Sequence, residues 1–184
     1  MNLQGGVTVI PESEIDKVLD DEIKKLLTLS FGWTQEFQER SYWHIKPETR
    51  LIYKDSKGRV LGHISIINKS AKIGNKEVKI AGAGAFAVHN EFRNSGIGKE
   101  LVQEMIKHVT MHGYDLIVAF AKDPASIHIC LKSGAVPTKD TFQVTYPDGG
   151  EVLKPHTLVW PISETKYQML LDYNHPINLG YGSW

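Results

Sequence analysis

The sequence predicts a mixed α/β fold in which an antiparallel meander is followed by a strand–helix–strand unit with parallel strands. Two hairpin signals separate extended apolar runs after residue 51. A glycine-containing turn at residues 93–98 then leads into a helical apolar stripe. The stripe is followed by Leu116–Phe120, a short and fully apolar run that is typical of a buried parallel strand. A strand, a helix and a parallel strand in this order form a right-handed unit.

The sequence pattern of the N-terminal part predicts two helices. Ser13 can cap the first, whose apolar residues recur at spacings of three and four: Ile15, Val18, Leu19, Ile23, Leu26 and Leu27. The aromatic-rich segment from Phe31 to His44 is less regular, and we expect a second short helix and a loop there.

The meander begins at Leu51. A hairpin is predicted at Asp55-Ser56-Lys57-Gly58, and a second at Gly74-Asn75, where positive φ angles suit a tight turn. The second hairpin leads into a strand over 78–88 that contains Gly82 and Gly84. Glycine within a strand indicates either a bulge with close backbone approach or tight packing of a helix on a small-residue face.

The rest of the chain predicts two helices and two further strands. The first helix has the apolar stripe Ile97, Leu101, Val102, Met105, Ile106 and Val109 and ends at Gly113. Asp123 caps the second, with Pro124 at its first position and Gly134 at its end. Strand-like segments follow at 141–146 and 157–160, around a turn at 147–150. Without repeats or linkers, residues 1–184 are predicted to form one domain.

Composition narrows the class of protein. The 21 basic and 21 acidic residues cancel, so neither nucleic acid nor an acidic membrane surface is an expected partner. The single cysteine, Cys130, excludes an internal disulfide framework and fits a reducing compartment. The first residues lack the features of a secretory signal, and the apolar stretches are too short to cross a bilayer. We expect a soluble, cytoplasmic protein without a metal.

The turn Arg93-Asn94-Ser95-Gly96-Ile97-Gly98 is the main functional signal. A helix that begins there directs unpaired N–H groups and the positive end of its dipole at one spot, which suits phosphate or pyrophosphate. Gly98-Lys99-Glu100 lacks the hydroxyl that a P-loop needs for magnesium, and a dinucleotide fingerprint needs a third glycine. The sequence therefore predicts another phosphorylated small molecule.

The turn is similar to the acyl-CoA turn of the GNAT N-acetyltransferases, written Arg/Gln-x-x-Gly-x-Gly/Ala. Arg93, Gly96 and Gly98 stand at its three fixed positions, and the order of elements around the turn is also similar. The resemblance implies a GNAT-like fold, with a central, mostly antiparallel sheet and a βαβ unit that binds acyl-CoA. It implies an enzyme that transfers an acetyl group from acetyl-CoA, as co-substrate, to an amine.

The same resemblance implies a cofactor site. The CoA pyrophosphate would be held by the backbone N–H groups of Arg93, Asn94, Ser95, Gly96, Ile97, Gly98 and Lys99. The strand around Phe86 and Val88 would hydrogen-bond the pantetheine arm. A bulge, expected at Gly82–Gly84, would open a wedge for the cofactor.

Over most of the chain, the sequence resembles the aminoglycoside 2'-N-acetyltransferases. Similar segments are Leu51-Ile52-Tyr53, Gly62-His63-Ile64, Ala87-Val88 to Arg93, Trp160-Pro161-Ile162, and the tail with Asp172-Tyr173 and Trp184. The resemblance implies that Asp172 and the Trp184 carboxylate contact an amino-sugar acceptor. Gly84, Cys130 and Gly182 replace a glutamate, a tyrosine and an aspartate of those enzymes, which indicates a different small-molecule amine.

Several residues are candidates for proton transfer or acceptor binding. His63 and His89 could serve as the base, or could be structural. Cys130 could protonate the leaving thiolate, or could be an inert buried thiol. Glu36 and Glu39 are candidate carboxylates for the acceptor, or solvated surface groups.

Two alternative functions stay open. One is an acyl-CoA-binding domain without turnover, because the matched glutamate and tyrosine are missing. The other is an acyltransferase for a longer acyl chain, with Phe31–Trp43 as a lid. The sequence determines neither the acceptor nor the oligomeric state, for which a homodimer is one option.

Overall fold

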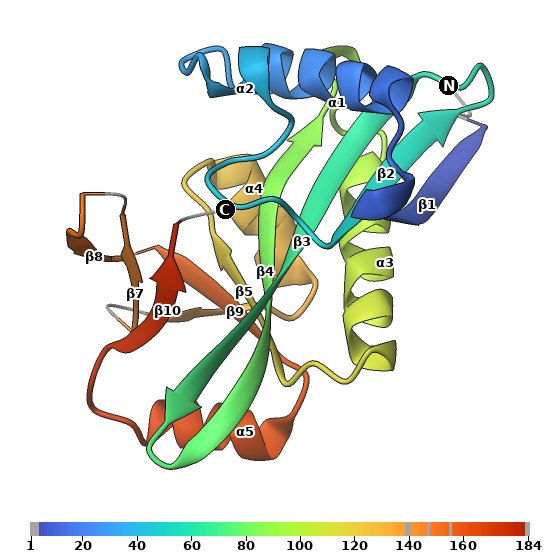
Figure 1. The fold of residues 1–184 in the computed structure, drawn as a ribbon. Helices are drawn as coiled ribbons and strands as arrows, with labels where there is room; N and C mark the ends of the chain where they lie inside the picture. Colours follow the sequence, from blue (N-terminus) through green and yellow to red (C-terminus); the bar gives the residue numbers. More distant parts are fainter. Residues whose placement is uncertain (1–3, 139–140, 147, 155, 183–184) are drawn as a thin grey trace.

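The computed structural model describes residues 4–138, 141–146, 148–154 and 156–182. Its main sheet has seven strands in the order β1-β2-β3-β4-β5-β9-β6 (Figure 1). Only β4 and β5 are parallel neighbours; the other neighbours in this sheet are antiparallel. The bounds are β1 (Gly5–Pro11), β2 (Thr49–Asp55), β3 (Val60–Ile73), β4 (Lys76–Val88), β5 (Leu116–Phe120), β6 (Val136–Thr138) and β9 (Thr157–Pro161).

Helices and a second sheet cover the main sheet. α3 (Ile97–Met111) and α4 (Pro124–Lys132) lie behind it in Figure 1, whereas α1 (Lys17–Ser30) and α2 (Glu36–Glu39) cross its upper end. A three-stranded sheet has the order β10-β7-β8. Its strands are β7 (Phe142–Thr145), β8 (Glu151–Leu153) and β10 (Ile177–Tyr181), and α5 (Glu164–Leu171) lies at the lower end of the β3–β4 hairpin (Figure 1).

Strand β5 separates two parts of the core. Ile117 and Ala119 pack in the cluster that contains the α3 side chains, while Leu116 and Val118 pack in the cluster that contains the second sheet and α5. Because both faces of β5 are covered, all its residues can be apolar. A third cluster lies between α1, α2 and the upper ends of β2, β3 and β4.

Most of the predicted elements are confirmed. Both hairpins form as expected, and α3 connects β4 to the parallel β5. Asp123 accepts a hydrogen bond from the Ser126 N–H at 2.9 Å and so caps α4, which Gly134 follows with φ +95°. The short helix expected between Phe31 and His44 is α2.

The N-terminal prediction is wrong in two respects. A strand, β1, comes first and pairs with β2, so the chain does not begin with helices. Ser13 lies in a 3₁₀ turn, η1 (Glu12–Glu14), and Asp16 caps α1 instead by accepting from the Leu19 N–H at 2.8 Å. β1 is an edge strand whose partner lies about 40 residues away, which no local pattern reveals.

In the tail, β7 and β9 confirm the two predicted strands, but β6, β8, α5 and β10 were not predicted. β10 pairs in parallel with β7, with a shift of register between Asn178 and Tyr181. The second sheet therefore depends on a pairing between distant segments.

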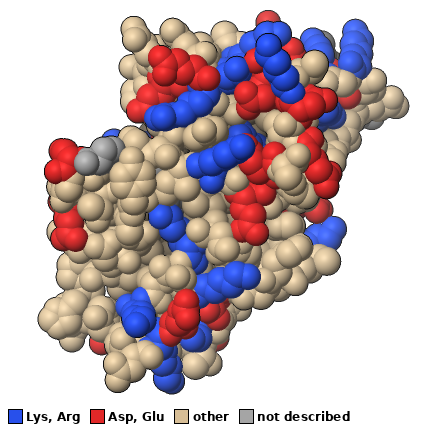
Figure 2. All heavy atoms as spheres, in the orientation of Figure 1, with Lys and Arg blue, Asp and Glu red and all other residues tan. Residues whose placement is uncertain are grey.

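Figure 2 shows Lys and Arg side chains interspersed with Asp and Glu on the face that it presents. Within the described ranges, none of the helices is long and apolar enough to span a bilayer.

Candidate functional site

Strands β4 and β5 separate at the centre of the sheet. They pair from Ile80 opposite Leu116 to Ala83 opposite Ala119, whereas β4 continues to Val88. Beyond Ala83, the β5-facing edge of β4 has no neighbouring strand in the described part of the sheet. This gives the wedge that the resemblance to the GNAT enzymes implies, with an open strand edge along one wall.

A bulge lies at Ala85–Phe86, just after the predicted position at Gly82–Gly84. Gly84 pairs with Ser65 and Ala87 with His63, so two residues of β4 lie opposite one residue of β3. Ala85 has φ +47°, which is unusual for a residue with a side chain. Gly82 and Gly84 both keep their places in the paired register, so the correction is one of position.

A cavity of about 400 Å³ occupies the wedge. Its wall on the β4 side includes the bulge, and its inner wall includes Val102, Met105 and Trp160, which belong to the core. Phe31, Trp33 and Trp43 form an aromatic rim. The Trp33 and Trp43 rings stack with centroids 5.7 Å apart, although Trp33 is 76% exposed. Most of the lining is apolar.

The polar part of the cavity contains residues that the sequence did not single out. The Lys154 ammonium donates to the Tyr146 hydroxyl at 2.7 Å and lies over the rings of Phe120 and Tyr146. The His44 ring meets the Tyr146 ring edge-on, with centroids 5.5 Å apart. His44, Tyr146 and Lys154 all line the cavity. Tyr146 follows β7, a strand of the second sheet, so only the tertiary structure brings these residues to His44.

Cys130 also lines the cavity, from α4. It is 4% exposed, and burial raises the pKa of its thiol to about 11. The thiol therefore stays protonated at neutral pH. Among the three catalytic residues that the sequence suggested, Cys130 is the one that reaches this cavity.

The predicted phosphate turn has the conformation that an anion site needs. Gly96 caps α3 with φ +96° and Asn94 has φ +63°. In the described part of the chain, nothing accepts a hydrogen bond from the first N–H groups of α3, those of Ile97, Gly98 and Lys99. A Cβ at Gly96 would meet no atom within 4 Å, so a ligand can approach its backbone.

Gly98 has a different role from Gly96. A Cβ there would lie 3.0 Å from Ile129 and 3.2 Å from Phe86. This glycine therefore allows α3 to pack closely on α4 and β4. Arg93, Asn94, Ser95 and Lys99 are exposed around the turn, and the Ser95 hydroxyl donates to the Phe92 carbonyl at 2.5 Å. Phe86 lines the cavity, and Val88 ends β4.

His63 lies outside the cavity lining and is fully buried. Burial, and then the nearby Arg50, lower its pKa to about 3, so the imidazole is neutral at pH 7. His89 caps the turn η2 (Asn90–Phe92), where its Nδ1 accepts from the Glu91 N–H at 3.4 Å. It is not among the residues that line the cavity.

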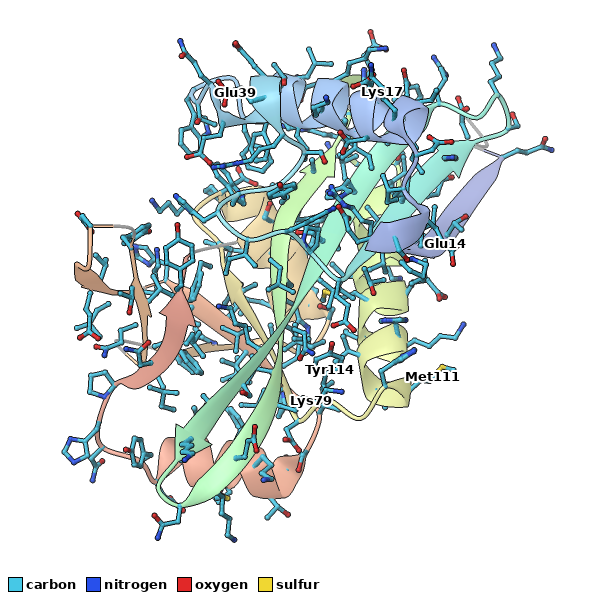
Figure 3. All side chains as sticks on the ribbon, viewed as in Figure 1. Glu14, Lys17, Glu39, Lys79, Met111 and Tyr114 are labelled. Carbon is cyan, nitrogen blue, oxygen red and sulfur yellow. The ribbon has the colours of Figure 1, made fainter. Side chains whose placement is uncertain are left out.

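The suggested acceptor contacts lie elsewhere. Glu36 pairs with Arg40 at 3.3 Å on α2, and Glu39 lies on the same helix at the edge of the molecule (Figure 3). Asp172 is exposed at the end of α5, where Gln168 donates to it at 3.0 Å. None of the three lines the cavity. Trp184 lies outside the described residues.

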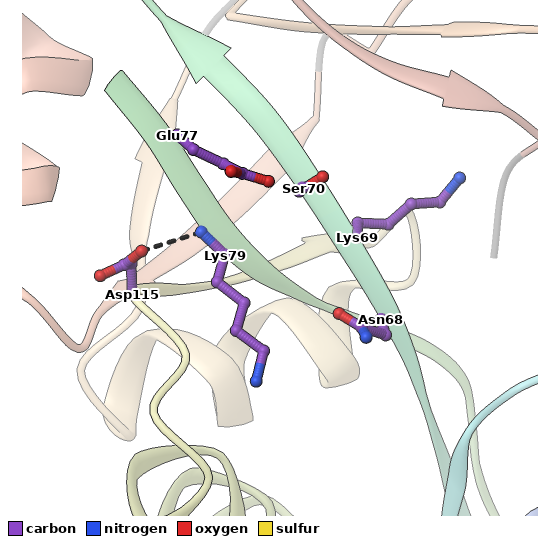
Figure 4. Close-up of a pocket in the computed structure, with 6 residues that line it drawn as sticks. All are labelled: Asn68, Lys69, Ser70, Glu77, Lys79 and Asp115. Carbon is purple, nitrogen blue, oxygen red and sulfur yellow. Dashed lines mark hydrogen bonds between the residues drawn. The ribbon is translucent and has the colours of Figure 1, made fainter.

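A second hollow, of about 540 Å³, lies on β3 and β4 away from the wedge (Figure 4). The Lys79 N–H donates to Asp115 at 2.8 Å, and the Lys79 ammonium donates to the His112 carbonyl and lies 4.2 Å from the Tyr114 ring centroid. The Lys69 ammonium donates to the Tyr181 carbonyl at 2.9 Å. Both of its lysines are thus bound by the protein itself.

Comparisons with known proteins agree with this geometry. A family model described as nodulation protein A (NodA) matches residues 6–131. The fold is similar to that of the GNAT N-acetyltransferase YhbS from Escherichia coli in complex with CoA, with 18% identity, a TM-score of 0.65, and coverage of 97% of this chain and 91% of that one. No curated protein sequence matches the chain.

Two further structures have the same fold. Escherichia coli ElaA has 14% identity and a TM-score of 0.62, with 85% and 99% of the two chains covered. A GNAT acetyltransferase from Brucella melitensis in complex with acetyl-CoA has 18% identity and a TM-score of 0.51, with 71% and 82% covered. The chain spans about a third of the length of two other matched structures. The protein therefore has the GNAT fold that its sequence predicts.

Proposed function

The chain belongs to the nodulation protein A (NodA) family, and from this membership we propose that it transfers an acyl group from acyl-CoA to the amine of a small molecule. The NodA family consists of N-acyltransferases, so the chain is an enzyme of that class. The observation that carries the proposal is the wedge between β4 and β5, because Phe86 in its lining lies against Gly98 of the turn at the start of α3.

The turn and the wedge suit the two ends of an acyl-CoA molecule. The N–H groups of Ile97, Gly98 and Lys99, together with the dipole of α3, favour the diphosphate. The open edge of β4 offers backbone groups to the pantetheine arm as an added strand would. The thioester would then lie in the cavity, close to the bulge at Ala85–Phe86.

The reaction needs no covalent enzyme intermediate. The amine nitrogen attacks the thioester carbonyl, a C–N bond forms, and the C–S bond breaks to release the CoA thiolate. One proton leaves the nitrogen, and one proton must reach the thiolate. Holding the amine against the thioester supplies much of the rate.

We infer that His44 is the group that takes the proton from the amine. It is the only histidine among the described residues that line the cavity. An imidazole can accept the amine proton and return it to the CoA thiolate, which balances the reaction. Cys130 is a poor proton donor for this step, because its pKa of about 11 lies above the ordinary value of a thiol, about 8.5.

The charges in the cavity favour an acceptor with few positive charges. Its described lining has one carboxylate, Asp123, and two cations, Lys122 and Lys154. Asp123 also caps α4. A polycationic aminoglycoside would need more carboxylates, so we propose another small-molecule amine and keep an aminoglycoside as one acceptor to test.

A longer acyl chain is a second candidate for the donor. Ile64, Val102 and Met105 are at most 2% exposed, yet they line the cavity, so it extends into the core. The aromatic rim of Phe31, Trp33 and Trp43 lies in the segment that the sequence suggested as a lid. An apolar extension of this kind suits a hydrocarbon chain better than an acetyl group.

Thiol release measures the proposed reaction directly. The protein would be mixed with acetyl-, butanoyl- or octanoyl-CoA and a panel of amines that includes an aminoglycoside and neutral amino-sugars. We expect free CoA and an N-acylated amine in equal amounts. Saturable CoA binding without turnover would instead identify an acyl-CoA sensor, and no CoA binding would contradict the proposal.

The rate of acyl transfer tests His44. We expect His44→Gln to lower kcat at least tenfold, with acyl-CoA affinity unchanged, because the variant has no group that takes the proton from the amine. His128→Gln is the matched control, because His128 is exposed on α4 and does not line the cavity. An unchanged kcat in His44→Gln would show that another group takes the proton.

A further inference from the structure

A buried network of hydrogen bonds connects the N-terminal part of the protein to the bulge. Arg50 is 0% exposed and makes a two-pronged ion pair with Glu12, at 2.6 and 3.0 Å. Its Nη1 donates to the Ser41 carbonyl at 2.6 Å and lies 3.5 Å from Nε2 of His63. The Ser41 hydroxyl in turn bonds to Asp20 of α1. Glu12 and the Ser41 carbonyl therefore fix the guanidinium of Arg50 in its position beside His63.

His63 extends this hydrogen-bond network to the backbone of β4. Its Nδ1 lies 2.8 Å from the carbonyl oxygen of Ala85. A carbonyl only accepts, so Nδ1 must carry the proton and Nε2 must present its lone pair to Arg50. The two neighbours thus determine both the tautomer and the orientation of the ring.

The carbonyl that His63 binds belongs to the bulge itself. Ala85 has a positive φ and lies outside the paired register of β3 and β4, so the ladder between these strands gives its carbonyl no regular partner. Ala85 is 4% exposed, and the contact of its carbonyl with His63 is buried, so the carbonyl points away from bulk solvent. A buried carbonyl without a donor is unfavourable. The bulge therefore depends on a side-chain donor, and His63 provides it.

The position of the bulge determines what the wedge presents to a ligand. Successive residues of a strand direct their backbone groups to alternate edges, and one extra residue reverses this alternation. From Phe86 onward, the bulge therefore decides which N–H and carbonyl groups of β4 face the open edge. Ala85 and Phe86 themselves line the cavity.

We propose that His63, oriented by Arg50 and Glu12, is a positioning residue that holds the Ala85–Phe86 bulge in the form that aligns an acyl thioester along β4. His63 does not touch the cavity and acts only through the Ala85 carbonyl. This inference rests on the proposed acyl transfer. Its first part, that His63 holds the bulge in place, can be tested without any substrate.

Two amide substitutions of His63 distinguish the hydrogen bond that Nδ1 makes to Ala85 from the contact that Nε2 makes with Arg50. His63→Asn places its amide nitrogen where Nδ1 was and keeps a donor for Ala85, whereas His63→Gln places its amide near Nε2 and loses that donor. Both bury a neutral amide, so they form a matched pair. The readouts are hydrogen exchange of the amides of residues 84–88, kcat for acyl transfer, the Kd for CoA, and thermal stability.

We expect His63→Asn to keep slow exchange in 84–88 and to retain kcat within about threefold. His63→Gln should exchange at least tenfold faster there, lose at least tenfold in kcat, and bind CoA more weakly than His63→Asn does, because the edge of β4 that the bulge aligns also binds the pantetheine arm. Equal exchange and equal kcat in the two variants, or a loss of kcat that follows thermal stability alone, would overturn the proposal. If the wild type shows no acyl transfer, the proposed function fails, and the exchange difference still decides whether His63 anchors the bulge.

Discussion

At the scale of single residues, burial determines what His63 can do. An exposed histidine takes up a proton near neutral pH, but His63 has no exposed surface and lies beside the Arg50 guanidinium. Both effects disfavour the imidazolium form and lower the pKa to about 3. The ring is therefore suited to hold a carbonyl, and less suited to carry a proton for catalysis.

The lowered pKa of His63 predicts a loss of stability in mild acid. Its pKa is about 3 in the folded state and about 6.5 in an unfolded chain. Between these values the unfolded state binds the additional proton, so the free energy of unfolding falls as the pH falls. This histidine alone should account for a loss of about 2 kcal/mol between pH 7 and pH 5.

Urea denaturation at pH 7 and pH 5 measures this loss. His63→Asn cannot titrate, so its loss should be smaller than that of the wild type by about the stated amount. His108, whose pKa burial also lowers, contributes in the same direction in both proteins and cancels in the comparison. The same loss in wild type and variant would show that His63 does not titrate with a lowered pKa.

Gly96 allows a test of the phosphate turn that separates charge from backbone strain. Asn and Asp tolerate a positive φ about equally well and have the same shape. Gly96→Asp should weaken CoA binding about ten- to hundredfold more than Gly96→Asn, because only the carboxylate repels the diphosphate. Isothermal titration with CoA measures both. Equal Kd values for the two variants would contradict a diphosphate at this turn.

At the scale of secondary-structure elements, the point at which β4 and β5 separate determines the volume of the wedge. Ala83 and Ala119 are the last pair, and both line the cavity. The small side chains leave the space open there. Larger residues on this face would narrow the cavity without disturbing the strand pairing below it.

Ala119→Leu should therefore discriminate against long acyl chains. We expect kcat/KM for octanoyl-CoA to fall at least tenfold more than for acetyl-CoA, since the added side chain occupies the inner part of the wedge. Val118→Ile is the control, because Val118 faces the other core cluster and adds bulk away from the cavity. Equal losses for both donors would place the acyl chain elsewhere.

At the scale of the whole molecule, ligand binding should appear as thermal stability. A ligand that binds only the folded state at 100 times its Kd adds about 2.7 kcal/mol. For a chain of this size we expect CoA to raise Tm by about 5–10 °C. Pantetheine lacks the diphosphate and should give a much smaller shift. A scanning calorimetry experiment that shows equal shifts for both would assign no binding energy to the turn at α3.

The sequence predicted the elements that local patterns define. The two hairpins, α3, β5 and α4 each have a turn residue, a cap or an apolar period within a few residues. β1 and β10 were missed because each is an edge strand that exists only through a distant partner. β8 was missed although its partner β7 is close in sequence, because the strand spans only Glu151–Leu153. Ala85 could not be identified as the bulge, because alanine carries no signal for a positive φ.

The candidate site divides in the same way. The glycine turn was visible in the sequence, because a helix start and the freedom of glycine are local properties. The cavity that joins His44 of the early loop to Tyr146 and Lys154 of the tail was not, because more than 100 residues separate them along the chain. Glu36, Glu39 and Asp172, which the sequence also suggested, lie outside it.

By itself the sequence determined the fold class and the place of the glycine turn at the start of α3, since hydrophobic period, capping and glycine act over a few residues. Only the tertiary structure decided that β4 bulges at Ala85, that His63 is buried against it, and that His44 faces the cavity. These outcomes depend on strand register and on the burial of polar groups, which arise only when distant segments pack together.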